Sequence, residues 1–249
     1  MSVWPDANIL EMIRSVTIDA HGVLLLPDPD AIRIVLREFS CEPDDATCWR
    51  AHYQMVRLLD QMEPPDWPTM NRSFAKALGV RPSDQVDAGA ILAQKVYLGT
   101  SWIPAPGASA ALARLTANGF GAAVVSNTIH GELAELLLRA EMCSVDGDFA
   151  SVAAIIDSQS IGIEKPDPRP FRLALDALGE SPARCIHVGD SLHSDVIGAI
   201  GVGMTAIHID PLDNCNDHEH GHSPSFEQFV HDLLKEVGPL RGYAGDSVA

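Results

Sequence analysis

Short apolar runs alternate with amphipathic segments from residue 104 onward, and this alternation constrains the fold more than any other feature. The runs have the length and apolar character of buried strands, and they occupy residues 121–125, 152–156, 185–188 and 204–209. The segments between and after them show the apolar spacing typical of helices, and they occupy residues 108–117, 131–140, 168–178, 194–200 and 224–237. Because strands alternate with helices, we predict an α/β fold with a parallel, doubly wound sheet.

Residues 29–104 follow a different pattern, in which helical spacing continues and no convincing strand is found. Breaks such as Pro64-Pro65 and Gly79 divide this block into four expected helices, at residues 31–39, 44–62, 69–78 and 83–97. The block follows the first predicted strand, so we expect an inserted helical domain. The predicted organisation is a core domain of residues 1–28 and 105–249, interrupted by a helical domain of residues 29–104.

The first predicted strand ends at Asp19, which is followed by Ala20, His21 and Gly22 before the apolar run resumes. Ligands of parallel α/β sheets bind just beyond the carboxyl ends of the strands, so Asp19 would lie at the mouth of such a site. The alternative is that Asp19 only caps a loop. Partners for Asp19 at other strand ends would favour the site.

Later segments supply such partners. They are, in chain order, Ser126 with Asn127, Lys165, and Asp190 with Asp195. A carboxylate can attack phosphorus as a nucleophile, and two carboxylates suit the oxygen-only coordination of Mg²⁺. A hydroxyl and a backbone N–H can hold a phosphoryl oxygen, and a lysine supplies the positive charge that a phosphoryl transition state requires.

The composition limits the classes of partner. The chain of 249 residues has a formal net charge of −17, which disfavours nucleic acid because phosphate backbones require a basic surface. A phosphate site must therefore carry its own positive charge, such as a divalent cation and a lysine. No membrane-length apolar run is present, and the N-terminus lacks the features of a signal peptide. Five scattered cysteines without a CxxC pair fit a reducing compartment, so we expect a cytoplasmic protein that binds neither nucleic acid nor membrane.

Four segments resemble, in order and spacing, the four motifs of the haloacid dehalogenase (HAD) superfamily. Residues 19–24 (Asp-Ala-His-Gly-Val-Leu) resemble the first motif, and the strand that ends in Ser126-Asn127 resembles the second. Residues 164–171 (Glu-Lys-Pro-Asp-Pro-Arg-Pro-Phe) are similar to the lysine motif, and residues 188–195 (Val-Gly-Asp-Ser-Leu-His-Ser-Asp) to the acidic fourth motif. The resemblance implies a Rossmann-like core, with residues 29–104 as a C1-type α-helical cap that closes over the site and selects the substrate.

The resemblance also assigns roles around a metal ion. Asp19 is the expected nucleophile and a metal ligand, and Lys165 is expected to bridge the nucleophile and the substrate. Asp190 and the backbone carbonyl of His21 are further expected metal ligands, and Asp195 is expected to bind or support the metal. The implied cofactor is Mg²⁺.

The expected substrate is a small phosphorylated molecule. Ser126 and Asn127 are expected to hold its phosphate. The implied activity is hydrolysis of a small phosphate ester through an aspartyl-phosphate intermediate. The identity of the substrate depends on the cap, whose residues follow no recognisable code.

His21 departs from the family pattern. Phosphatases of this family usually have a second aspartate there, which acts as general acid and base. The metal ligand at this position is a backbone carbonyl, so metal binding should survive the change. A histidine can donate and accept protons near neutrality; alternatively, His21 marks a slow or altered enzyme.

Two alternative functions remain open. Dehalogenases of the superfamily also lack the second aspartate, so a 2-haloacid dehalogenase-type hydrolase is one alternative. Those enzymes work without metal and lack the Gly-Asp pair of the fourth motif, so Gly189-Asp190 favours the phosphatase. The other alternative is a catalytically weak HAD-like binding or regulatory protein.

A second candidate metal site lies in the polar stretch 217–222. It contains three alternating histidines, His218, His220 and His222. Such histidines can bind zinc or nickel. The alternative is a solvated loop between the last strand and the last helix.

The second helix of the inserted block carries candidate pocket residues. Trp49, His52 and Tyr53 could line the substrate pocket. Core packing explains the two aromatic side chains equally well.

Overall fold

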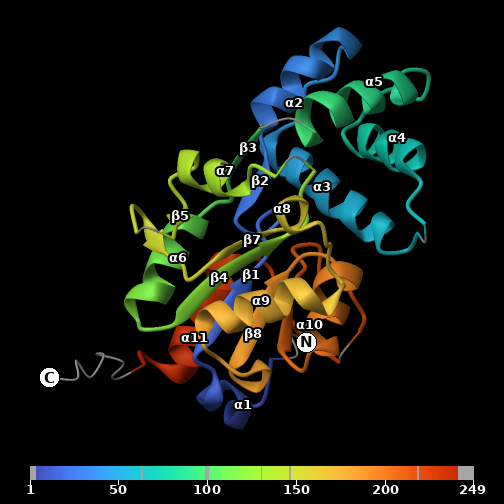
Figure 1. The fold of residues 1–249 in the computed structure, drawn as a ribbon. Helices are drawn as coiled ribbons and strands as arrows, with labels where there is room; N and C mark the ends of the chain where they lie inside the picture. The colour runs from blue at the N-terminus through green and yellow to red at the C-terminus, as the bar shows by residue number, and fades with distance from the viewer. Residues whose placement is uncertain are drawn as a thin grey trace, which may run out of the picture.

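The computed structural model describes residues 4–62, 64–98, 101–129, 131–145, 147–217 and 219–240. A six-stranded parallel sheet has the order β10-β9-β8-β1-β4-β7 (Figure 1). Its strands are β1 (Ser15–Ile18), β4 (Gly121–Ser126), β7 (Ile155–Asp157), β8 (Cys185–Gly189), β9 (Thr205–Ile209) and β10 (Gly221–Ser223). Ser15 pairs with Gly121 on one side and Cys185 on the other, so the carboxyl ends of β4, β1 and β8 meet at one edge. The predicted α/β class and parallel sheet are confirmed.

Helices cover both faces of this sheet (Figure 1). One face packs on α6 (Ala108–Ala117), α7 (Leu133–Arg139) and α11 (Phe226–Val237), and the other on α9 (Pro168–Leu178) and α10 (Gly198–Gly201). Val16 and Ile18 of β1 belong to the first apolar cluster, whereas Ala123 and Val125 of β4 face Ala174 of α9. Both faces are buried, which explains why the strand sequences are mostly apolar and do not alternate with an exposed polar face.

Four helices form a separate group beyond the sheet (Figure 1). They are α2 (Pro29–Leu36), α3 (Asp45–Leu59), α4 (Trp67–Ala77) and α5 (Gln85–Leu92). They enclose an apolar cluster of their own, which includes Ile32, Met70 and Phe74. The chain enters and leaves the group through β2 (Leu25–Pro27) and β3 (Trp102–Pro104), which pair antiparallel. We propose on this basis that residues 29–104 are a cap domain on a core of residues 1–28 and 105–249.

Aspartate side chains fix where the helices of this group begin. Asp28, Asp44 and Asp66 each accept a hydrogen bond from a backbone N–H in the first turn of α2, α3 and α4. Such caps satisfy donors that the helix itself leaves unpaired. The helix expected at residues 44–62 therefore begins at the predicted place, but it ends earlier, at Leu59. Asp60 is its C-cap residue and faces the rest of the molecule.

Several short strands, β3 and β10 among them, depart from the sequence predictions. The expectation that residues 29–104 contain no strand is wrong at β3, and β10 lies in a segment expected to be a loop. Both strands have only three residues, too few to show an alternating pattern. The remaining elements are α1 (Ala7–Met12), η1 (Arg37–Phe39), η2 (Ala93–Tyr97), β5 (Cys143–Ser144), β6 (Ala150–Ser151), α8 (Ser158–Ile161), η3 (Pro182–Arg184) and η4 (Leu192–Ile197). Among the described residues, no helix has the length and apolar character needed to span a bilayer.

Candidate active site

The predicted site residues come together at the carboxyl edge of the sheet. Asp19 directly follows β1, Ser126 ends β4, and Asp190 directly follows β8. Lys165 reaches them from the loop between α8 and α9, and Asp195 reaches them from η4. All five residues are buried, so the charges among them are only weakly screened by water.

Lys165 connects two carboxylates of this edge. Its Nζ donates hydrogen bonds to Oδ1 of Asp19 at 2.7 Å, to Oδ1 of Asp195 at 2.5 Å and to the carbonyl oxygen of Val125 at 2.7 Å. An ammonium has three donors, so all of them are used. Burial disfavours the charged lysine, but the two carboxylates outweigh burial and raise the pKa of Lys165 above its ordinary value. Lys165 is therefore a fixed positive charge.

Asp195 is held on both of its oxygens. His187 Nε2 lies 3.1 Å from Oδ1, and the backbone N–H of Ser191 donates to Oδ2 at 3.0 Å. The hydroxyl of Thr17 lies 2.9 Å from Nδ1 of His187. With its proton on Nε2, the His187 ring donates to Asp195, and its Nδ1 accepts from the Thr17 hydroxyl. Burial favours protonation of Asp195, but Lys165 and His187 outweigh it and lower the pKa of Asp195. Asp195 thus orients Lys165.

Asp190 keeps one oxygen that no described protein group satisfies. Its Oδ2 is buried without a hydrogen-bond partner, and Nε2 of His52 lies 3.4 Å away, also without a hydrogen bond. Gly22 approaches the same oxygen so closely that a Cβ at this residue would lie 1.8 Å from Oδ2. The φ angle of Gly22 is +82°, a conformation that glycine adopts without strain. The sequence therefore provides glycine where the first motif must turn around Asp190.

The buried cluster carries more negative than positive charge. Oxygens of three carboxylates lie within 4.8 Å of one another, those of Asp19, Asp190 and Asp195. Three carboxylates face one ammonium, so the ionised cluster has two negative charges in excess. The nearby histidines do not offset them, because burial lowers the pKa of His21 to about 4 and that of His52 to about 3.

Burial makes two of these carboxylates weaker acids than an ordinary aspartate. Burial raises the pKa of Asp19 to about 6, despite the opposing effect of Lys165. Burial, followed by the charges of Asp19 and Asp195, raises the pKa of Asp190 well above its ordinary value. A divalent cation that prefers oxygen ligands would balance the two excess charges and would satisfy the unpartnered oxygen of Asp190. The donor set therefore fits Mg²⁺.

His21 lies between the sheet and the aromatic side chains above it. Its ring centroid is 4.3 Å from that of Trp102, and its Nδ1 lies 3.4 Å from the hydroxyl of Ser126. Burial, together with the positive charge of Lys165, accounts for its lowered pKa. At neutral pH the imidazole is therefore neutral, a form that can accept a proton.

Asn127 and Ser126 occupy different positions in the site. The side-chain oxygen of Asn127 accepts a hydrogen bond from the backbone N–H of Lys165 at 2.8 Å, and its amide nitrogen donates to the carbonyl of Lys165 at 3.0 Å. The Asn127 side chain therefore fixes the lysine loop. The hydroxyl of Ser126 instead lies buried beside Asp19 and His21. Of the two side chains, that of Ser126 therefore faces the carboxylates.

A family model described as haloacid dehalogenase-like hydrolase matches residues 13–203. The chain belongs to the haloacid dehalogenase-like hydrolase family. The matched span contains every site residue described above, so the motif resemblance of the sequence and the geometry of the site agree on the family. This HAD-like hydrolase thus has its motifs assembled around one buried edge.

Curated relatives of this HAD-like hydrolase include phosphatases. It is 35% identical over 102 residues to a glyceraldehyde 3-phosphate phosphatase of Pyrococcus furiosus, with 41% of this chain and 40% of the relative covered. It is 34% identical over 105 residues to a phosphoserine phosphatase of Thermus thermophilus, with 42% and 40% covered. The chain thus spans about two fifths of the length of these relatives.

Solved structures with the same fold include the HAD-hydrolase YfnB from Bacillus subtilis bound to magnesium. That match has a TM-score of 0.60 at 17% identity and covers 89% of this chain and 98% of the other. A dehalogenase with an intermediate complex matches with a TM-score of 0.57 at 20% identity, covering 92% and 98%. At these identities the matches establish the fold.

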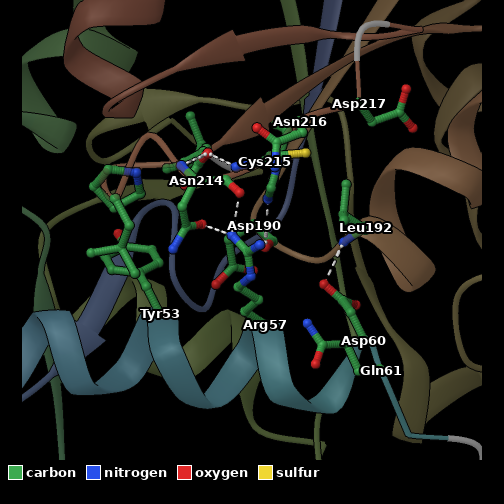
Figure 2. A pocket seen from close by; sticks show the side chains of 15 residues that line it. Tyr53, Arg57, Asp60, Gln61, Asp190, Leu192, Asn214, Cys215, Asn216 and Asp217 are labelled. Carbon is green, nitrogen blue, oxygen red and sulfur yellow. Dashed lines mark hydrogen bonds between the residues drawn. The ribbon is translucent and has the colours of Figure 1, made fainter. Parts of the chain in front are cut away.

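Asp60, which was not predicted from the sequence, joins α3 to the fourth motif. Its carboxylate accepts hydrogen bonds from the hydroxyl of Ser191 at 2.6 Å, from the N–H of Leu192 at 2.8 Å and from the N–H of His193 at 3.1 Å. Figure 2 shows Tyr53 and Asp60 projecting from α3 toward these loops. Tyr53, Arg57 and Asp60 are spaced four and three residues apart, so they share one face of α3. This spacing was the signal in the sequence that could have identified Asp60.

The pocket drawn in Figure 2 flanks Asp190 and has a volume of about 190 Å³. Tyr53 lines it and donates a hydrogen bond from its hydroxyl to the carbonyl of Gly22 at 2.8 Å. His52 lies beside Asp190. Trp49 instead borders a neighbouring pocket of about 350 Å³, so two of the three candidate pocket residues of this helix reach the site.

Proposed function

We propose that this protein is a Mg²⁺-dependent phosphatase that hydrolyses a small phosphate ester through an aspartyl-phosphate at Asp19. The observation that carries the proposal is the convergence of three buried carboxylates, one of which has an unpartnered oxygen, with a buried lysine on the expected nucleophile. A phosphoryl group needs positive charge around its oxygens, and the site provides a place for it. The phosphatase names of two relatives support the same activity.

Asp19 begins the reaction as the nucleophile. One of its carboxylate oxygens attacks phosphorus, the bond between phosphorus and the ester oxygen breaks, and the leaving oxygen takes up a proton from water. Lys165 holds Asp19 in place at 2.7 Å and contributes positive charge next to the phosphoryl oxygens. Water then attacks phosphorus, which releases inorganic phosphate and restores the Asp19 carboxylate.

The Mg²⁺ ion would be held by Asp19, Asp190 and the backbone carbonyl of His21. When bound, it supplies positive charge to the phosphoryl oxygens and neutralises the two carboxylates. Asp195 supports this set through Lys165, because its own oxygens are already bound by Lys165, His187 and the N–H of Ser191. Ser126 and the backbone at Asn127 would hold the phosphate.

His21 would take the proton from the attacking water. A neutral imidazole can accept a proton, so it is suited to that step. The leaving alcohol needs a proton donor, and the neutral imidazole of His21 is not suited to that role. A substrate whose leaving group is stable without a proton, such as an aryl phosphate, should therefore react faster than an alkyl phosphate. His21→Asp introduces a carboxyl of the kind phosphatases of this family usually have, so it should increase alkyl phosphate hydrolysis more than aryl phosphate hydrolysis.

The surroundings of the site suggest the kind of substrate. We propose that the cap of residues 29–104 encloses it, since His52 lies 3.4 Å from Asp190 and Trp102 packs against His52 and His21. An enclosed, buried site favours a small molecule over a macromolecule. The five cysteines form no disulfide, which supports our proposal of a reducing, cytoplasmic location.

A substrate panel tests the proposal. Aryl phosphates, alkyl phosphates and a 2-haloacid are offered to the wild type and to His21→Asp, with Mg²⁺ or with a chelator. Phosphate release only with Mg²⁺ supports the phosphatase. Halide release in the presence of chelator would establish the dehalogenase instead. If the wild type is inert and His21→Asp gains phosphatase activity, the protein is a binding protein on an enzyme scaffold.

A further inference from the structure

Three histidines and one cysteine form a second cluster beside the active site. It consists of His208, Cys215, His220 and His222, whose ligand atoms all lie within 4.8 Å of one another. The parallel pairing of β9 and β10 places His208 directly opposite His222. His220 precedes β10 by one residue, and Cys215 comes from the loop that follows β9.

The separations within this cluster are within about half an ångström of those in a tetrahedral metal site. Nε2 of His220 lies 2.9 Å from Nε2 of His222 and 3.8 Å from Sγ of Cys215. With zinc–nitrogen and zinc–sulfur bonds of about 2.1 and 2.3 Å, tetrahedral geometry separates two nitrogens by about 3.4 Å and a nitrogen and sulfur by about 3.6 Å. Small side-chain adjustments would suffice to bind an ion.

The outer contacts of two histidines also fit metal binding. Nε2 of His208 lies 3.1 Å from the carbonyl oxygen of Asp190, while its Nδ1 is buried without a hydrogen-bond partner. In His220 the nitrogen directed to an oxygen is Nδ1, which is buried without a hydrogen bond and lies 3.7 Å from a carboxylate oxygen of Asp217. Histidines that bind metal usually donate their other ring nitrogen to a carbonyl or carboxylate. His208 and His220 thus each direct one ring nitrogen to an oxygen and the other toward the cluster.

The loop that carries Cys215 is fixed independently of the cluster. A carboxylate oxygen of Asp210 accepts hydrogen bonds from the N–H of Asn214 at 2.9 Å and from the N–H of Cys215 at 2.8 Å. Figure 2 shows Asn214 and Cys215 on this loop above α3. The thiol therefore reaches the histidines from a preformed turn.

We propose that His208, Cys215, His220 and His222 bind one Zn²⁺ ion. Nitrogen and sulfur donors favour zinc over Mg²⁺, so this site is chemically distinct from the carboxylate site. The ion would tie the loop after β9 to both strands, and His208 would connect it to the backbone of Asp190. The histidine site predicted from residues 217–222 thus includes His220 and His222, while His218 lies outside the described residues.

Metal content and a spectroscopic probe test this proposal. The full chain, without a histidine tag, is loaded with Zn²⁺ or with Co²⁺ and then desalted. We expect one retained zinc per chain and, with Co²⁺, a thiolate charge-transfer band in the near ultraviolet. Cys215→Ser should lose the band, and His222→Asn should lower zinc retention. Asp19→Asn should keep both, which separates this site from the proposed phosphatase activity.

Matched controls assign the signal. Cys41→Ser changes the other half-buried cysteine, and His231→Asn changes an exposed histidine, so both should behave as the wild type. A Co²⁺ spectrum that is unchanged in Cys215→Ser would overturn the proposal, as would a wild type that retains no zinc. If Cys215→Ser does not fold, the wild type and Cys41→Ser decide: the band in both supports the site, and its absence from either contradicts it.

Discussion

Replacing Lys165 by methionine should destabilise the protein strongly, because this lysine is the positive charge among three buried carboxylates. Methionine preserves most of the apolar stem but removes the ammonium that contacts Asp19, Asp195 and the carbonyl of Val125. Removing one partner of a buried ion pair costs roughly 3–5 kcal/mol, since the remaining charge stays buried without compensation. For a chain of this size, each kcal/mol lowers the thermal midpoint by about 2–4 °C. We therefore expect a decrease of about 6–20 °C.

Thermal unfolding in the presence of a chelator measures this effect without a contribution from bound metal. Lys76→Met is the control, since Lys76 is exposed on α4, and it should change stability by no more than about 0.5 kcal/mol. Asp195→Asn, added to Lys165→Met, removes one of the carboxylate charges that the lysine no longer balances. The double variant should therefore be more stable than the sum of the two single effects predicts, by roughly 0.5–3 kcal/mol.

The result that would refute this reasoning is a small effect. If Lys165→Met lowers stability by less than about 1 kcal/mol, the carboxylates are not held as a charged cluster by the lysine. If the double variant is simply additive, Asp195 and Lys165 act independently despite their contact. Either result would remove the charge argument on which the metal site depends.

Two further predictions concern the surroundings of Asp190. Asp60→Ala removes the three hydrogen bonds to the fourth motif. It should raise the Mg²⁺ concentration for half-maximal activity roughly tenfold, equivalent to about 1.4 kcal/mol. Gln61 lines the same pocket, so Gln61→Ala is the control, and equal effects of the two variants would contradict the role of Asp60. Gly22→Ala would place a Cβ against Oδ2 of Asp190 and should abolish the increase in thermal midpoint that Mg²⁺ produces. Gly179→Ala has the same left-handed strain but open space around the added Cβ, so it should retain that increase; retention in Gly22→Ala would argue against metal binding at Asp190.

The sequence was sufficient to predict the strand ends and hence the main site residues. Asp19, Ser126 and Asp190 each end or follow a mostly apolar strand, and parallel strands bring their carboxyl ends to one edge. The bridging role of Lys165 required the family resemblance, because this residue lies in a loop that has no periodicity. The different roles of Ser126 and Asn127 could not be predicted, since they depend on which backbone groups the folded loop of Lys165 leaves unpaired.

The features that the sequence did not predict depend on contacts between segments that are distant in the chain. Asp60 and Ser191 are separated by 131 positions and meet because α3 ends above the fourth motif. His208 and His222 become neighbours through β10, a strand too short to predict. Local patterns therefore identified chemistry that lies on single strands, whereas side chains brought together by loops required the three-dimensional structure.

The most direct test of the central claim is the Mg²⁺-dependent release of phosphate from an aryl phosphate by the wild type and by Asp19→Asn. We predict turnover by the wild type with Mg²⁺, none with a chelator, and a loss of at least roughly 10³-fold in Asp19→Asn, because the nucleophile is removed. The variant should remain folded, which circular dichroism would verify. Undiminished, Mg²⁺-dependent turnover by Asp19→Asn would contradict the proposed mechanism.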